Sequence, residues 1–329
     1  MTHLPVRFRP PGLTALLSSD RARWTTLIIL AAVIGVIPWF FPSGFYFRVA
    51  ALIWVTALAA VGLQILMGQA GQVSLGHAGF VGIGAYAVAL GPKLLGLDVL
   101  LCLPLGAVVA GGIAFLVGRP ILRLKGHYLA VATLGFGMLV GMVLVNEVGL
   151  TGGPDGIRIP RAELFGWRIR GSETFYWITG VALLTGVWIA LNLQDSPSGR
   201  ALAALHDSEV AARTVGIDVT CHKLRAFVIA AVYGAVAGGL LALMNGFVTP
   251  DAAGFLASIE YVTMVVIGGL ASVPGAVVGA ALLVLLPQTL TFLHEYEQAV
   301  IGLLIMLFMI FLRAGIVPGL AGLLRRRPG

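Results

Sequence analysis

Glutamine, serine and histidine side chains interrupt one of the most apolar parts of this sequence. The run at residues 68–79 carries four of them: Gln69, Gln72, Ser74 and His77. Apolar segments at residues 47–66 and 80–90 flank the run. Amide, hydroxyl and imidazole groups can bind a polar solute or a neighbouring helix, and an unpaired polar group inside a membrane costs several kcal/mol. The sequence therefore predicts a break that packs against protein or lines a wet pathway, and both readings stay open.

A carboxylate stands within a late apolar segment, at Glu260. An acid at such a position can carry a proton or a cation, or it can pair with a basic group at the membrane interface. Together with the polar run it completes the set of candidate translocation-path residues: Gln69, Gln72, Ser74, His77 and Glu260.

The residue types that enzymes use form no known constellation in this sequence. The histidines are scattered without metal-ligand spacing, and neither a zinc-protease helix motif nor a nucleophile elbow is present. A phosphate-binding Walker motif is also missing, so we expect no catalytic residue, no metal site and no bound cofactor. At this point a polytopic membrane enzyme, which the missing catalytic groups disfavour, and an ion-coupled secondary carrier both stay open.

Composition indicates an integral membrane protein. The chain is 59% hydrophobic and 11% charged, with a mean hydropathy of +0.99, whereas soluble domains carry about 25% charged residues. We expect an all-α helix bundle with about ten membrane segments, eight to ten in all. The candidates are residues 24–41, 47–66, 73–90, 97–117, 128–145, 175–193, 224–244, 259–270, 276–286 and 297–312. The eighth and ninth are short, which fits a re-entrant pair broken at residues 272–275.

Lys and Arg positions predict the orientation. With the N-terminus inside, 15 of the 21 Lys and Arg residues fall in the segments predicted to be cytoplasmic, which favours both termini inside. The predicted domains are a cytoplasmic segment at residues 1–23, a membrane domain at residues 24–313 and a basic tail at residues 314–329. The membrane domain has an outer loop at residues 146–174 and an inner loop at residues 194–223.

Two further patterns concern local structure. In the inner loop, Asp207-Ser208 offers a helix N-cap and Gly216 a helix end, so we expect one or two short helices there. The patterns Gly234-x-x-x-Gly238 and Gly275-x-x-x-Gly279 predict close helix packing. Glycine-rich breaks at residues 68–79 and 268–279 also raise the possibility of an inverted repeat.

Several stretches resemble the LivM-type permease family of branched-chain amino acid ABC transporters. The resemblance covers about residues 45–313 in order, and the stretches that carry it are residues 71–80, 82–86, 124–137, 150–157, 199–227 and 258–276. His127 and His206 depart from the family pattern, because an acid and an arginine respectively are common there. The resemblance implies a multi-pass protein of a bacterial inner membrane with a fold like that of type II importers.

The resemblance also implies partners and sites. The partners are a homologous second permease, two cytoplasmic ATPases that use ATP, and a periplasmic or lipid-anchored binding protein. Residues 209–216 are similar to the motif by which permeases dock into an ATPase groove, and the implied coupling residues are Arg200, Asp207, Glu209, Ala211, Ala212, Arg213 and Gly216. The implied docking residues for the binding protein are Thr151, Gly152, Gly153, Pro154 and Asp155. Branched-chain amino acids are the implied cargo, with urea, short amides or aromatic carboxylates as alternatives.

Overall fold

The computed structural model describes residues 13–160, 163–164, 167–168, 171–270, 272–289, 302, 306 and 315–319. Seven of the described helices are long and apolar enough to cross a membrane. They are α1 (Leu13–Phe40), α2 (Gly44–Gln64), α3 (His77–Leu95), α4 (Val99–Ile121), α5 (His127–Asn146), α7 (Ser172–Asp195) and α10 (Val219–Asn245). A mostly helical membrane protein is therefore confirmed.

The number of membrane segments and the inverted repeat are not confirmed. Two more apolar helices are present, α11 (Phe255–Gly268) and α12 (Val273–Thr289), with 14 and 17 residues. Both are shorter than the roughly 20 residues that a straight crossing needs. They pack against each other and against α2. The predicted segment at residues 297–312 lies outside the described residues.

Helix α1 belongs to a compact unit that ends at Phe41, and the remaining helices form a second unit that begins at Pro42. The predicted membrane domain at residues 24–313 thus includes parts of both units. Everything described below concerns the second unit.

Helix α2 lies at the centre of the second unit. It packs against α7, α10, α11 and α12. The short π-helix η1 (Ile65–Gln69) continues α2, and 94% of the apolar span that the two helices form is buried inside the protein. Small residues make this possible: a Cβ on Gly62 would overlap the side chain of Tyr233 on α10. A helix surrounded by other helices needs such residues, because they let the backbones approach closely.

The crossing of α3 and α10 is equally close. A Cβ on Gly84 would overlap the carbonyl oxygen of Ala235, and one on Gly238 would overlap that of Val81. On α12, a Cβ on Gly279 would overlap the carbonyl oxygen of Met264 in α11. The close packing that both small-residue patterns predict is therefore confirmed.

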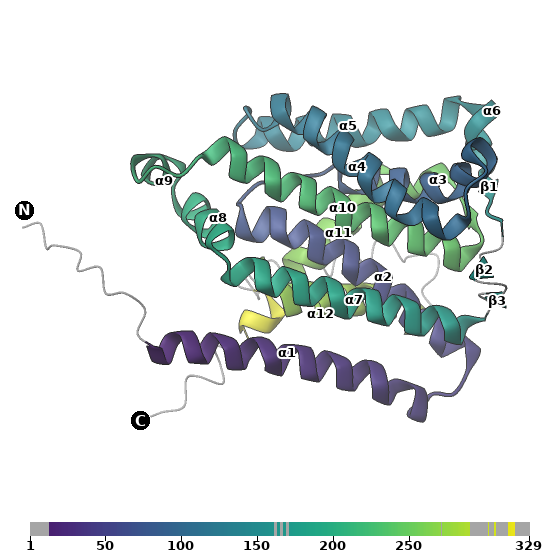
Figure 1. Cartoon of the computed structure of the whole chain (residues 1–329), viewed down its shortest axis with the longest axis horizontal. Helices are drawn as coiled ribbons and strands as arrows, with labels where there is room; N and C mark the ends of the chain where they lie inside the picture. Colours follow the sequence, from purple (N-terminus) through teal and green to yellow (C-terminus); the bar gives the residue numbers. More distant parts are fainter. Residues whose placement is uncertain are drawn as a thin grey trace, which may run out of the picture. The chain divides into compact units, whose positions relative to one another are not determined.

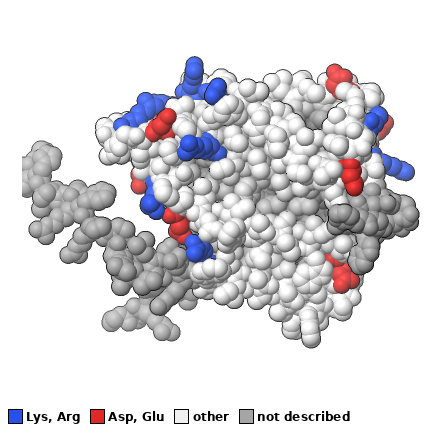
Figure 2. All heavy atoms as spheres, viewed as in Figure 1, with Lys and Arg blue, Asp and Glu red and all other residues white. Residues whose placement is uncertain are grey.

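Two groups of short elements lie at opposite ends of this bundle (Figure 1). One end has α8 (Pro197–Asp207) and α9 (Glu209–Thr214), and Figure 2 shows Lys and Arg side chains gathered over it. The other end has α6 (Val148–Thr151), η2 (Gly153–Asp155), η3 (Pro250–Ala253) and four strands of two residues each, namely β1 (Ile157–Arg158), β2 (Glu163–Leu164), β3 (Trp167–Arg168) and β4 (Phe247–Val248). The antiparallel pair β1–β4 ties the outer loop to the end of α10.

The third predicted segment begins too early. The sequence analysis started it at Val73, but α3 begins at His77, and residues 71–76 are not helical. Gly71 has a φ of 65°, which right-handed helices exclude, and the Leu75 N–H donates to Thr133 Oγ1 at 3.1 Å. Ser74 therefore precedes the helix that begins at His77.

Candidate functional site

The polar run at residues 68–79 is buried against protein. The exposed fractions of Gln72, Ser74 and His77 are 7%, 3% and 1%. His77 Nε2 lies 3.0 Å from the carbonyl oxygen of Ala59 on α2, and its ring stands edge-on to that of Tyr261 on α11, with 5.8 Å between the ring centres. His77 thus connects α3 to α2 and α11. These contacts agree with the alternative in which the polar run packs against protein.

The end of α2 and the π-helix that continues it contain amides with incomplete hydrogen bonding. Gln64 Nε2 donates to the carbonyl oxygen of Leu270, but Gln64 Oε1 and both side-chain polar atoms of Gln69 are buried without a partner among the described residues. A buried amide without a partner costs about 1–3 kcal/mol. Such groups are rare in stable cores, so this segment is a candidate for rearrangement.

Glu260 lines a cavity of about 340 Å³ between α2, α10, α11 and α12. A second cavity, of about 450 Å³, is lined by Arg48, Asn245 and Thr249, and the side chains of Leu241 and Ala252 line both. Both volumes lie in the range of small-molecule sites. Sequence analysis missed Arg48, although a lone cation near the start of an apolar segment was the available signal.

The inner loop forms two capped helices. Ser196 Oγ accepts from the Gly199 N–H at 3.1 Å and caps α8, and Ser208 Oγ accepts from the Ala211 N–H at 3.3 Å and caps α9. Gly216, at a φ of 84°, follows α9. The predicted N-cap at Ser208 and the helix end at Gly216 are confirmed, and α8 starts at Pro197.

The two alanines of the predicted coupling motif point in different directions. Ala212 is buried in a cluster with Leu205 and Val219, whereas Ala211 is exposed. The exposed fractions of Val210 and Val215 are 75% and 74%. Four other predicted coupling residues are exposed as well: Arg200, Asp207, Arg213 and Gly216. Helix α9 therefore presents an exposed apolar strip, which consists of Val210, Ala211 and, directly after the helix, Val215. An apolar strip with charged neighbours is typical of a helix that binds in a groove.

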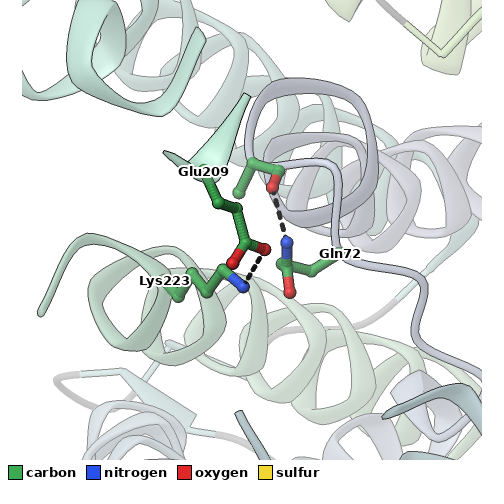
Figure 3. Close-up of polar contacts among 4 residues, drawn as sticks. Gln72, Glu209 and Lys223 are labelled. Carbon is green, nitrogen blue, oxygen red and sulfur yellow. Dashed lines mark hydrogen bonds and ion pairs between the residues drawn. The ribbon is translucent and has the colours of Figure 1, made fainter. Parts of the chain in front are cut away.

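Glu209 has a partner within the chain. Its carboxylate forms an ion pair with the ammonium group of Lys223 on α10, and the Gln72 side chain lies beside this pair (Figure 3). The side chain of Lys223 is 4% exposed and that of Glu209 is 28% exposed. Pairing of Glu209 with a partner protein remains a prediction, and Lys223 is a site residue that the sequence analysis missed.

In the outer loop the candidate docking residues divide into two groups. Thr151 is buried, and its hydroxyl donates to the carbonyl oxygens of Leu144 at 2.6 Å and Glu147 at 2.8 Å. Gly152 and Gly153 form the turn, with φ values of 73° and 59°. Pro154 and Asp155 are exposed. The last two can therefore contact another protein, while the first three shape the loop.

The long apolar helices, the buried break between α2 and α3 and the exposed pair α8–α9 are together the features of a multi-pass transport protein. The chain belongs to the family of permease components of branched-chain amino acid transport systems, whose model matches residues 45–309.

Individual relatives agree with the family. The chain is 34% identical over 317 residues to the high-affinity branched-chain amino acid transport permease LivM of Salmonella typhimurium. This alignment covers 89% of this chain and 75% of the relative. It is 28% identical to LivH of Escherichia coli over 79% of this chain and 90% of the relative. It is also 26% identical to the ribose import permease RbsC of Escherichia coli, over 90% and 94%. No solved structure matches the chain.

The structure makes Thr151 a support of the outer loop. We expect Thr151→Val to lower the free energy of unfolding by about 1–3 kcal/mol, because the Leu144 and Glu147 carbonyl oxygens each lose the hydroxyl donor and the Gly153 N–H loses its acceptor. Thr151→Ser keeps the hydroxyl and should remain near wild type. The measurement is the thermal unfolding midpoint of the purified protein in detergent, with Thr185→Val, which removes an exposed hydroxyl bond on α7, as control. Equal midpoints for Thr151→Val and the control would contradict the assignment.

Proposed function

We propose that this chain is the permease subunit of an ATP-driven importer that moves branched-chain, hydrophobic amino acids across the bacterial inner membrane. The observation that carries this proposal is the similarity to LivM over 89% of the chain. The exposed apolar strip of α9 supports it, since a permease without an ATPase of its own needs a surface that receives one.

The proposed assembly contains several proteins. The chain is similar to both LivM and LivH, which supports a pair of homologous permeases in one transporter. We propose that two cytoplasmic ATPases bind α9 and hydrolyse ATP, while this chain binds no cofactor. A periplasmic or lipid-anchored binding protein delivers the amino acid to the end that carries Pro154 and Asp155, which are exposed there.

The two cavities support a route for the substrate. The cavity lined by Arg48 lies toward the end of the bundle opposite to α8 and α9, because Arg48 stands at the start of α2 and Asn245 at the end of α10, and the Glu260 cavity adjoins it at Leu241 and Ala252. Arg48 offers a partner for a carboxylate and Glu260 one for an ammonium group, with Leu241 between the two cavities. The two charged partners suit the carboxylate and the ammonium group of an amino acid, and the apolar wall suits a hydrophobic side chain. A role of Gln69, Gln72, Ser74 and His77 along the route remains a prediction.

Other cargoes and mechanisms are the competing functions. The similarity to RbsC shows that related permeases carry other solutes, although the identity is 26% rather than 34%. Urea, short amides and aromatic carboxylates are the alternative cargoes within the same type of machine. An ion-coupled carrier would transport without any ATPase subunit.

Uptake measurements test the cargo. In a strain that lacks its own leucine importers, the complete transporter should accumulate labelled leucine in competition with isoleucine and valine, and it should not accumulate labelled urea. Accumulation without ATPase subunits would indicate a secondary carrier instead.

Within this assay Glu260→Gln should reduce leucine uptake, whereas Asp251→Asn, the loss of an exposed carboxylate on η3, should not.

Docking of the ATPases is tested on α9. Val210→Asp places a charge on the apolar strip, so we expect the ATPases to be lost from the purified complex while the amount of permease in the membrane is unchanged. Val148→Asp makes the same change at an exposed valine of α6, at the other end of the bundle, and should retain the ATPases. Retention with both variants would rule out docking through α9.

Orientation is tested by single cysteines in a background that lacks Cys102 and Cys221. We propose that α9 is cytoplasmic, since Lys and Arg gather at its end of the bundle, and that both termini are cytoplasmic, since 15 of the 21 Lys and Arg residues then fall inside. A thiol reagent that cannot cross the membrane should label Asp155→Cys in intact cells and Val210→Cys after permeabilisation alone. The reverse pattern would invert the proposed topology.

A further inference from the structure

A buried ion pair, an apolar cluster and a close backbone contact connect the inner loop to the helix break. Lys223 belongs to the second turn of α10 and is 3% exposed. An ammonium group that is buried this deeply needs an anionic partner, because burial removes its hydration and no other favourable interaction replaces it. The partner is Glu209, the first residue of α9. The ion pair therefore fixes the start of α9 to α10.

The apolar cluster strengthens this connection. Leu205 of α8, Ala212 of α9 and Val219 of α10 are buried together, and Ile217 packs against them. Asp218 caps α10 by accepting a hydrogen bond from the Cys221 N–H at 3.0 Å. Since the ion pair joins α9 to α10 and this cluster joins both of them to α8, these two helices and the start of α10 form one packed piece.

This piece rests on the helix break. A Cβ on Gly71 would lie 3.0 Å from His206 Nδ1 near the end of α8, so the backbone at Gly71 and the His206 side chain are in contact. Helix α8 also packs against η1. Gln72 lies beside the Lys223–Glu209 pair, and its amide donates to the carbonyl oxygen of Ala70 at 2.9 Å (Figure 3).

The segment under this piece has features of a rearrangeable helix end. It is a π-helix of five residues, and single π-turns are rare and occur often at functional sites. It also contains Gln69, whose buried amide has no partner among the described residues. The break after it turns at Gly71 in the left-handed region, where glycine is at ease.

We propose that Lys223 is a positioning residue of the import reaction. When an ATPase docks and displaces α9, the ion pair between Lys223 and Glu209 transmits this displacement to the break at residues 70–76. This inference rests on the proposed function. The positive charge of Lys223 is needed in the pair, whereas its exact atoms are not. An exposed cation on the same helix, such as Arg225, has no part in this link.

Charge exchange tests the link in the complete transporter, reconstituted into lipid vesicles. Lys223→Met should lower the number of amino acids imported per ATP hydrolysed by about tenfold, within the range of couplings between linked sites. Arg225→Met should leave that number unchanged. Lys223→Glu should be as defective as Lys223→Met, and the exchange Lys223→Glu with Glu209→Lys should recover most of the loss. The amount of assembled complex is measured for each variant, because a merely structural defect lowers that amount and not the ratio.

A labelling experiment judges the link without transport. Gln72→Cys in a background without Cys102 and Cys221 is buried, so it should react slowly with a membrane-permeant maleimide. Lys223→Met should raise that rate clearly, and Arg225→Met should not. The proposal is overturned if the exchanged pair recovers nothing in assembled complexes, or if Lys223→Met changes neither the import ratio nor the labelling rate. Failure of the wild-type complex to import amino acids would reject the proposed function alone, since the labelling result stands by itself.

Discussion

Direct backbone contact between helices is the constraint on which the rest of this structure depends. At Gly62, Gly84 and Gly238 an added Cβ would overlap a neighbouring helix. Because α2 can therefore be enclosed by other helices, the polar side chains that follow it are buried within the protein: Gln69, Gln72 and Ser74. This enclosure permits a π-helix, a non-helical stretch and several buried amides at a depth where lipid would exclude them.

The same enclosure decides what the polar residues do. His77 is held by a carbonyl oxygen of α2 and by the ring of Tyr261, so its ring contacts two other helices. Arg48 and Glu260 are exposed and line cavities, whereas the buried Lys223 has an ion-pair partner. The buried cation is thus paired, as the cost of burying an ion dictates.

Sequence patterns predicted the long helices well, because a run of about 20 apolar residues has few alternatives in a membrane. Cap residues also predicted α9, from Ser208 to Gly216. The start of α3 was wrong, since an apolar count does not register the left-handed turn at Gly71. The pairing of Glu209 with Lys223 was missed because their contact depends on how α9 folds back onto α10. The β1–β4 pair escaped for a similar reason, as its strands lie about ninety residues apart in the chain.

Helix α10 joins the two ends of the bundle, since its first turns hold Lys223 and its last residues lead into β4, which pairs with the outer loop. Its 27 residues correspond to about 40 Å of continuous helix. If this helix has two positions, then a protein that favours one of them at the β1–β4 end must alter the affinity of whatever binds α9, and the reverse effect has the same size. A single rod of this kind therefore makes the surfaces at the two ends of the bundle thermodynamically reciprocal.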